Sequence, residues 1–392
     1  MNRRGQKDVI VVGGGVVGAA CAALLARMGL DVALVEGREP ARWSAQQPDL
    51  RVYAIAPDSA ALLDQAGAWE SIRNARAHAY RRMRVWDAVG GGELSFDADA
   101  LGRKRLGWII ENDLLQDRLW SLLPAAGVHV RCPVRVQALE QDDDGVRLRL
   151  DDDSRLDARL VIAADGADSS VRALAGLEVD AHDYAQRGVV AFVQTEAPHQ
   201  DTAWQRFLTT GPLALLPFAE GSSSIVWTLP NDEAARMLAL SDAVFGRELT
   251  LALQARLGEV TLHSQRVAFP LRRQLARELV SGRVLVAGDA AHVVHPLAGQ
   301  GVNLGLRDVA ALAASIADAQ ARRLPWDAPH RLARWSRTRR SENAAAAWTF
   351  DGINRVFSND DLPASLLRGP LLGWAGRLPG VANLLWRKAS GL

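Results

Sequence analysis

Residues 8–36 constrain the fold of this chain more than any other stretch. They predict a short strand, a glycine-rich turn, a helix and a second short strand, and Gly13, Gly15 and Gly18 give the turn the spacing G-x-G-x-x-G. Glycines at this spacing allow a tight turn, a close approach of the backbone to a pyrophosphate, and close packing of the helix against the strand. The sequence therefore opens with the pattern of a Rossmann-like dinucleotide-binding unit.

Glu36 ends the second strand, eighteen residues after Gly18. A carboxylate at that position accepts hydrogen bonds from an adenosine ribose and disfavours a 2′-phosphate, so the pattern favours FAD or NAD over NADP. The uncharged run 9–26 follows a basic N-terminus and also resembles a signal peptide or a short membrane span. The glycines within the run and the strand after it favour a nucleotide-binding unit instead.

Composition narrows the class of protein. The chain has 392 residues, a net charge of +1 and two cysteines, Cys21 and Cys132. This length predicts more than one structural unit, and the balanced charge predicts no nucleic-acid partner. The cysteines show neither metal-binding spacing nor a disulfide pattern, which is typical of a protein of the reducing cytoplasm.

Two later motifs place carboxylates after buried strands. The strand predicted at residues 159–164 runs into Asp165, and another ends at Asp289, each beside a glycine. In open α/β sheets ligands bind at the carboxyl ends of strands, so both motifs are expected at a ligand-binding edge. Farther along, the glycine-rich segment 295–308 runs into an apolar-periodic helix, whose first N–H groups would be open to an anion.

The middle of the chain has a different sequence pattern. Between residues 180 and 270, short β-rich segments dominate, with one helix predicted from about 232 to 257. Residues 80–97 add two strands joined by a glycine-rich turn. We expect a mainly antiparallel sheet that carries a substrate pocket.

Together the motifs resemble a known family. The G-x-G-x-x-G turn, DGADSSVR at residues 165–172 and GDAAH with the following P..GQG.N at residues 288–303 are similar, in this order, to the FAD-dependent aromatic hydroxylases related to p-hydroxybenzoate hydroxylase. Within them, HPLAGQGVNLGLRD at residues 295–308 resembles the signature of the ubiquinone-biosynthesis hydroxylases of the UbiH, UbiF and VisC (UbiI) group.

The resemblance implies an α/β fold with a Rossmann-like FAD-binding domain, an inserted, mainly antiparallel β-sheet substrate-binding domain and a C-terminal helical region. The expected FAD-binding domain is discontinuous and comprises residues 1–75, 108–178 and 276–345. The expected substrate-binding domain comprises residues 76–107 and 179–275, and the helical region comprises residues 346–392.

The resemblance also implies an activity. Such enzymes are monooxygenases that hydroxylate the aromatic ring of a polyprenylated phenol in ubiquinone biosynthesis, with O₂ as oxidant and transiently bound NADPH or NADH as electron donor. A soluble FAD hydroxylase of a small aromatic acid is the nearest alternative. A non-catalytic flavoprotein scaffold of a biosynthetic complex is the second, but the intact glycines, Glu36 and Asp289 argue against it, because a scaffold needs no complete cofactor site.

By the same resemblance, the cofactor-binding residues come from all three motifs and from the segments between them. Those of the first motif, with Glu36, would hold the adenosine half of FAD. The full expected set is Gly13, Gly15, Gly18, Glu36, Arg51, Asn112, Asp165, Asp289, Gly299, Gln300, Gly301, Val302 and Asn303.

The remaining residues have individual expected roles. Arg51 would lie near the flavin, and Asn112 would approach FAD from the start of a helix, although helix capping is an alternative role for Asn112. Asp165 would support the pyrophosphate region, and Asp289 would hydrogen-bond the ribitol. The backbone of residues 299–303 would face the pyrimidine end of the flavin, where a helix N-terminus stabilises the negative charge of the reduced ring.

Other features are less specific. Pro296 is expected to line the flavin ring, and no side chain is identified as an acid–base catalyst. His292 and His295 have H-x-x-H spacing, but no third ligand is evident and both lie in a flavin motif, so no metal is predicted. The tail 362–392 has four basic residues and no acids. It suits either an interfacial helix at the inner face of the membrane or a packing helix, and a homo-oligomer or a biosynthetic complex is left open.

Overall fold

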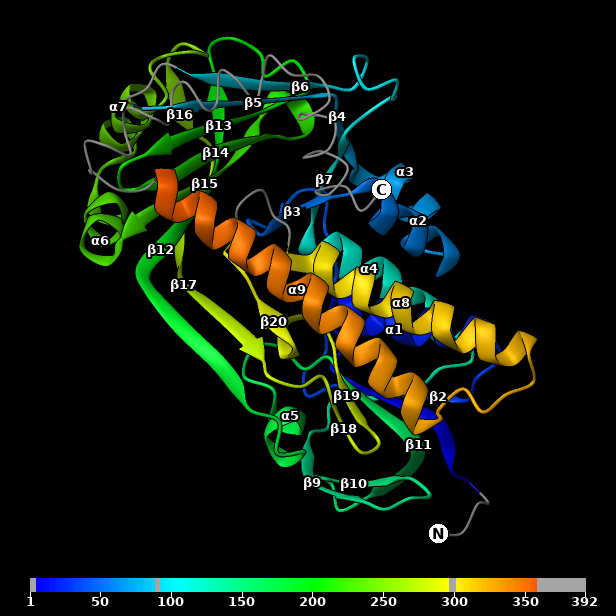
Figure 1. The fold of residues 1–392 in the computed structure, drawn as a ribbon. Helices are drawn as coiled ribbons and strands as arrows, with labels where there is room; N and C mark the ends of the chain where they lie inside the picture. Colours follow the sequence, from blue (N-terminus) through cyan, green and yellow to red (C-terminus); the bar gives the residue numbers. More distant parts are fainter. Residues whose placement is uncertain (1–4, 89–91, 296–300, 358–392) are drawn as a thin grey trace.

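The computed structural model describes residues 5–88, 92–295 and 301–357. In Figure 1 these residues form two large sheets, a small sheet near both of them, and two long helices, α8 (Gly301–Ala321) and α9 (Pro329–Phe357), that lie side by side. Helix α9 contacts β14 (Gly211–Pro217) of one large sheet and β18 (Val280–Ser281) of the other. The expected α/β fold with a mainly antiparallel second sheet and C-terminal helices is confirmed.

The first large sheet is built around parallel strands. Its main order is β18-β19-β11-β1-β2-β8, with β10 and β9 attached to β11. The strands are β1 (Lys7–Val12), β2 (Val32–Val35), β8 (His129–Arg131), β9 (Val136–Gln141), β10 (Val146–Leu150), β11 (Arg155–Ala163), β18 (Val280–Ser281) and β19 (Val284–Val286). The central strands β1, β2, β11 and β19 run parallel, so their carboxyl ends meet at one edge.

Helices supply the apolar side chains that cover this sheet. Helix α1 is buried along most of its length because it contacts β1, β2, α4 and α8, and its alanines permit that close packing. Burial raises the pKa of the Cys21 thiol to about 12, as expected for a small core residue. The helices of this part are α1 (Val16–Arg27), α2 (Pro57–Gln65), α3 (Trp69–Arg76), α4 (Asn112–Leu122), α5 (Ser170–Leu174), α8 (Gly301–Ala321) and α9 (Pro329–Phe357).

The second large sheet has the order β20-β17-β12-β15-β14-β13-β5-β6, with β16 attached to β12. All its pairs are antiparallel except β13 with β5. The strands are β5 (Arg82–Asp87), β6 (Glu93–Asp97), β12 (Val179–Thr195), β13 (Thr202–Leu208), β14 (Gly211–Pro217), β15 (Ser223–Pro230), β16 (Val260–Leu262), β17 (Val267–Ala276) and β20 (His292–Val293).

The prediction of a single helix from about 232 to 257 is wrong. The structure has two helices there, α6 (Asn231–Ala239) and α7 (Asp242–Ala252). The chain is extended at Leu240 and Ser241, which separates them, and positive φ angles of 56° at Gln254 and 48° at Ala255 follow the end of the second. An L-residue in the left-handed region cannot continue a right-handed helix, so the apolar periodicity outlasts the helix itself.

A three-stranded sheet of β3 (Val52–Ile55), β7 (Gly107–Glu111) and β4 (His78–Tyr80) packs against the antiparallel sheet through apolar side chains. The late motif also connects the two large sheets, because the chain passes from β19 of the first sheet into β20, which pairs with β17 of the second. The exact domain boundaries stay a prediction, and most of the expected helical region lies outside the described residues. Among the residues that are described, no helix is long and apolar enough to cross a membrane.

Candidate active site

Gly13 and Gly18 are required by close packing at the end of β1. Gly13 has a φ of 103°, and a Cβ atom there would collide with the backbone of Ala164. A Cβ atom at Gly18 would collide with the carbonyl oxygen of Gly13. At both positions glycine is therefore required by neighbouring protein backbone and not by contact with a ligand.

Gly15 differs from these two glycines. A Cβ atom built on Gly15 meets no atom within 4 Å, so its backbone borders open space at the start of α1. The first N–H groups of a helix have no partner within it and carry a partial positive charge. The turn thus leaves an open cradle for an anion at the position where the sequence predicts a pyrophosphate.

Two side chains of α4 hold this turn, and the sequence analysis missed both. Gln116 Nε2 donates to the carbonyl oxygen of Gly14 at 2.8 Å, and Trp120 Nε1 donates to the same oxygen at 2.6 Å. The only signal for them was their spacing of four residues, which places them on one face of a helix. They fix the plane of the peptide that leads into Gly15.

Glu36 lies beside the glycine turn. The N–H of Gly14 donates to Glu36 Oε2 at 2.6 Å, and the N–H of Arg38 donates to Oε1 at 3.0 Å. Each carboxylate oxygen accepts more than one hydrogen bond, so the group has capacity left for ribose hydroxyls. The geometry suits the expected role of Glu36, which stays a prediction.

A second cluster contains Arg51, Tyr53 and Asp289. The pKa of Arg51 is raised, chiefly by the adjacent Tyr53 and further by the carboxylates of Asp49 and Asp289. Burial raises the pKa of Tyr53 to about 12. The structure therefore brings Arg51 and Asp289 into one electrostatic environment and adds Tyr53, which no motif marked, while the expected roles of Arg51 and Asp289 toward FAD stay predictions.

Asp289 follows β19 in a short 3₁₀ turn, Gly288–Ala290. Its side chain keeps an exposed surface, but the surrounding protein removes enough water to raise the pKa of the carboxyl group, while the charges of His292, Arg51 and Arg272 act in the opposite direction. An accessible carboxylate in such a recess gains from donors that a ligand brings. This suits the predicted bond to a ribitol hydroxyl.

Asn112 does not cap a helix. Glu111 occupies the N-cap position of α4, no side chain makes the cap bond, and Asn112 is already the first helical residue. Its amide instead donates to Asp113 Oδ1 at 2.9 Å, and its oxygen accepts from the hydroxyl of Tyr53 at 3.4 Å. The capping alternative is wrong because the helix begins one residue earlier than that role requires.

Asp165 organises the start of a helix at the sheet edge. Its carboxylate accepts from the hydroxyls of Ser169 and Ser170 and, at 3.2 Å, from the N–H of Val171. The nearby buried Arg172 donates to the carbonyl oxygens of Ala167 at 2.9 Å and Ala290 at 2.8 Å. Arg172 thereby joins the second motif to the third, whereas the predicted support of a pyrophosphate by Asp165 stays a prediction.

The buried carboxylate of Asp308 on α8 holds the third motif in place. Asp308 Oδ2 accepts from the N–H of Gly288 at 3.1 Å and contacts His292 Nε2 at 2.6 Å. Asp308 Oδ1 accepts from Arg339 Nε of α9 at 2.8 Å and from Asn343 Nδ2 at 3.2 Å. Burial alone would raise the pKa of Asp308, but the charges and hydrogen bonds of His292 and Arg339 hold it below its usual value.

The first turn of α8 begins at Gly301. The buried side chain of Asn303 accepts from the N–H of Ala56 at 2.9 Å and donates to the carbonyl oxygen of Ala54 at 2.8 Å, so it clamps the helix to β3. The expected contacts of Gly301, Val302 and Asn303 with the flavin would therefore be made by their backbone. Pro296, Gly299 and Gln300 lie outside the described residues.

A buried carboxylate that the sequence analysis missed fixes the loop before Arg51. Glu111 accepts from the indole N–H of Trp43 at 3.1 Å and from the backbone N–H of Asp49 at 3.1 Å, and pairs with Arg76 at 3.4 Å. Burial raises the pKa of the Glu111 carboxyl group, although the hydrogen bonds from Trp43 and from the Asp49 N–H and the charge of Arg76 act in the opposite direction. Asp49 in turn accepts from the N–H of Arg51, so the buried acid positions the residue expected near the flavin.

Comparison with known proteins decides the family. Residues 6–345 match the family described as FAD binding domain. The chain belongs to this family of FAD-binding proteins.

Relatives of this FAD-binding protein extend along nearly the whole chain. It is 38% identical over 366 residues to 3-demethoxyubiquinol 3-hydroxylase of Escherichia coli, covering 92% of each chain. It is 37% identical over 388 residues to the ubiquinone hydroxylase UbiL of Rhodospirillum rubrum, covering 98% of this chain and 89% of the relative. Among solved structures, p-nitrophenol 4-monooxygenase from Pseudomonas putida shares the fold, with a TM-score of 0.79, 22% identity and 98% coverage of both chains.

The residues present fit FAD. The cradle at Gly15 suits a pyrophosphate, and Glu36 borders it. Arg51, just before β3, shares one electrostatic environment with Asp289, which follows β19, and the flavin half would extend toward them. The flavoprotein thus offers an anion site at one end and accessible polar side chains at the other. Such a site supports a redox reaction in which the protein binds and orients the cofactor.

One group of residues has the composition of a metal site but a different role. His78, His199 and Asp201 lie close enough to share an ion. However, His199 Nδ1 accepts from the N–H of Asp201 at 3.1 Å, and its Nε2 contacts the carbonyl oxygen of Phe218 at 3.2 Å. Both ring nitrogens are therefore engaged with backbone, so the group fits a structural role in joining β4 to the antiparallel sheet.

Proposed function

We propose that this flavoprotein hydroxylates the aromatic ring of a polyprenylated phenol in ubiquinone biosynthesis, with FAD as cofactor, O₂ as oxidant and NADPH or NADH as electron donor. The observation that carries the proposal is the 38% identity, over 92% of each chain, to a hydroxylase of 3-demethoxyubiquinol. The fit of the site to FAD supports it. A small aromatic acid as substrate has no comparable support.

The residues have distinct parts in this proposal. The open backbone at Gly15 and the N-terminus of α1 would bind the pyrophosphate, Glu36 the ribose, and Asp289 the ribitol. The backbone N–H groups at the start of α8 would stabilise negative charge at the pyrimidine end of the ring. Bound FAD would supply the chemistry that accepts a hydride and activates O₂.

The antiparallel sheet offers an apolar surface for the prenyl chain. A cavity of about 10 Å³ lies between β3, β4 and β7 on one side and β5, β13 and β14 on the other. It is lined by Ala54, Tyr80, Met83, Ile109, Ala203, Trp204, Gln205, Ala214 and Leu216. That volume holds roughly one water molecule, so we propose that these mostly apolar side chains separate when a prenylated substrate enters.

The proposal also includes the location of the protein in the cell. A cytoplasmic protein that meets the inner face of the membrane through residues 362–392 would reach a prenylated substrate in the bilayer. The segment carries four basic residues and no acids, which suits contact with anionic lipids, but it lies outside the described residues. Membership of a biosynthetic complex or a homo-oligomer is part of the same proposal.

Mass spectrometry of quinone intermediates in a deletion strain tests the proposed function. A strain that lacks this chain and any backup hydroxylase is expected to accumulate an under-hydroxylated polyprenyl phenol, and the wild-type chain should remove it. The variant Asp289→Ala should fold, lose FAD and fail to complement. Normal quinone levels in the deletion strain would refute the proposal, and complementation by an FAD-free variant would refute a catalytic role.

A further inference from the structure

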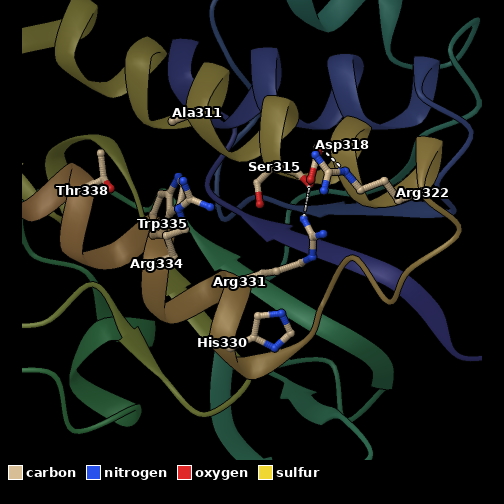
Figure 2. A pocket seen from close by; sticks show the side chains of 9 residues that line it. All are labelled: Ala311, Ser315, Asp318, Arg322, His330, Arg331, Arg334, Trp335 and Thr338. Atoms are coloured by element: carbon tan, nitrogen blue, oxygen red, sulfur yellow. Dashed lines mark hydrogen bonds and ion pairs between the residues drawn. The ribbon is translucent and has the colours of Figure 1, made fainter.

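A basic groove lies between α8 and α9, on a part of the molecule that the proposed reaction does not use. Its volume is about 540 Å³. The lining residues are Ala311, Ser315, Asp318, Arg322, His330, Arg331, Arg334, Trp335 and Thr338 (Figure 2). Three guanidinium groups and an imidazole thus share the groove with a single carboxylate.

The one carboxylate is already paired with two of the cations. Asp318 Oδ1 pairs with Arg322 Nε at 2.8 Å, and Asp318 Oδ2 pairs with Arg331 at 3.0 Å. Figure 2 shows Arg331 reaching from α9 across to Asp318 of α8. These hydrogen bonds and charges lower the pKa of Asp318, so it is ionised at neutral pH and cannot neutralise a third cation.

Several donors of these cations have no acceptor among the residues that the structure describes. Arg331 is only 14% exposed, and its Nε atom is buried without a hydrogen-bond partner among the described residues. Arg334 and His330 make no hydrogen bond or ion pair with any residue that the structure describes. A desolvated guanidinium with an open donor favours an anion, which restores the hydrogen bonds lost to burial.

The start of α9 adds to this positive potential. The helix begins at Pro329 and has no acidic residue in its first turn, which instead carries His330 and Arg331. Cations at a helix N-terminus oppose the macrodipole, whereas an anion there is stabilised by it. The hydroxyls of Ser315 and Thr338 offer further donors at the rim.

We infer that this groove is a binding site for a phosphate group, separate from the flavin site. Guanidinium groups recognise phosphate through paired hydrogen bonds, and a cavity of this volume accommodates a small ligand. The groove does not serve hydride transfer, because Ser315 lies fourteen residues beyond Gly301, which is about 21 Å along a helix. The basic tail 362–392 is not complementary to it in charge.

Calorimetric titration of the FAD-loaded wild-type protein with inorganic pyrophosphate tests the site. We expect saturable binding that weakens about tenfold in Arg334→Gln and further in Arg331→Gln/Arg334→Gln, since one charge-assisted hydrogen bond is worth about a factor of ten. Arg334 has no partner within the described protein, so its variant should keep the wild-type Tm. Arg247→Gln, an exposed arginine on α7, is the matched control and should bind as the wild type does.

A second experiment, flotation with lipid vesicles, distinguishes a lipid headgroup from a soluble phosphate as the ligand. Flotation with phosphatidylcholine vesicles containing phosphatidic acid should recover less of the double variant than of the wild type if the source is a lipid. Equal recovery, together with the expected pyrophosphate result, assigns the site to a soluble phosphate. Absence of saturable pyrophosphate binding, or equal affinity in the wild type and the double variant, would overturn the inference and leave the proposed hydroxylation untouched.

Discussion

The protein builds two turns at the carboxyl ends of the parallel strands β1 and β19, and it holds them in different ways. The turn after β1 is held by glycines that leave no room for a Cβ atom, by hydrogen bonds from the neutral side chains of Gln116 and Trp120, and by one hydrogen bond to the partly exposed carboxylate of Glu36. The turn after β19 is held by a buried carboxylate, Asp308, whose charge is balanced by side chains of two other elements.

Because of this difference, we expect the first turn to be disturbed mainly by added side-chain volume and the second mainly by the loss of a charged partner. Packing around the first turn is sensitive to a single added methyl group, and the one carboxylate that contacts it, Glu36, keeps some exposure to water. The second turn has a dry ion pair between α8 and α9, and removal of one partner leaves the other charge without compensation. The two turns should therefore fail under different perturbations.

The largest effect is expected from Arg339→Met. The variant removes the guanidinium that pairs with the buried carboxylate of Asp308 and leaves only the contacts with His292, Asn343 and the Gly288 N–H, so the free energy of unfolding should fall by about 3–5 kcal/mol. Chemical denaturation of the FAD-loaded protein measures this. Arg340→Met is the control: Arg340 pairs with Glu278 on the surface, and its loss should change stability far less. Equal effects of the two substitutions would contradict the distinction between the turns.

The same network explains what sequence reasoning could and could not reach. The spacing of Gly13, Gly15 and Gly18 is local, so the first turn was predictable, although the backbone that leaves no room for a Cβ atom at Gly13 is that of Ala164, which follows β11. Asp308 and Arg339 lie 31 residues apart on different helices, and their pairing depends on how α8 and α9 pack. No pattern along the chain reports such a contact.

The arrangement around Arg51 shows the same limit. A motif marked Arg51 itself, but the buried Glu111 that positions its loop bonds to partners 62 and 68 residues away. Likewise, the apolar pattern from 232 to 257 did not reveal the extended residues Leu240 and Ser241. Sequence periodicity reports which face of a segment is buried, and tertiary contacts decide where the segment breaks.

A pH series of the Arg339→Met variant sharpens the comparison. In the wild type the pKa of Asp308 is depressed, so its contribution to stability is present above the unfolded value of about 3.9 and is lost only at lower pH. Without Arg339 the folded-state pKa should rise above that value, so the variant should gain stability as pH falls from 7. The deficit should shrink by at most about 1.4 kcal/mol per pH unit.

Denaturation at pH 7, 6 and 5 measures this trend. Arg339→Lys keeps a cation near Asp308 and should show a smaller deficit that changes less with pH. A deficit that stays constant in Arg339→Met would mean that lost packing, not the uncompensated charge, destabilises the variant.

The first turn is probed by two alanine substitutions. In Gly18→Ala the new Cβ atom meets the carbonyl oxygen of Gly13, so the free energy of unfolding of the FAD-free protein should fall by about 1–3 kcal/mol. In Gly15→Ala the methyl group enters open space, so the FAD-free protein should keep its stability, while FAD affinity falls about tenfold or more. Denaturation without FAD and titration with FAD separate the two effects. A loss of FAD-free stability in Gly15→Ala would show that the cradle is packed against protein.

The smallest effect is expected from Trp120→Phe. Phenylalanine keeps most of the apolar contact but removes the N–H that donates to the carbonyl oxygen of Gly14 at 2.6 Å, so the unfolding free energy should fall by about 1 kcal/mol. Gln116 still donates to the same oxygen at 2.8 Å, which limits the loss, and the deficit should be the same at pH 7 and pH 5. The double variant Gln116→Leu/Trp120→Phe leaves that oxygen without either donor, so its deficit should exceed the sum of the single deficits. Strict additivity would mean that the Gly14 carbonyl finds water in their place, and that the first turn is held by its glycines and by Glu36 without the two donors of α4.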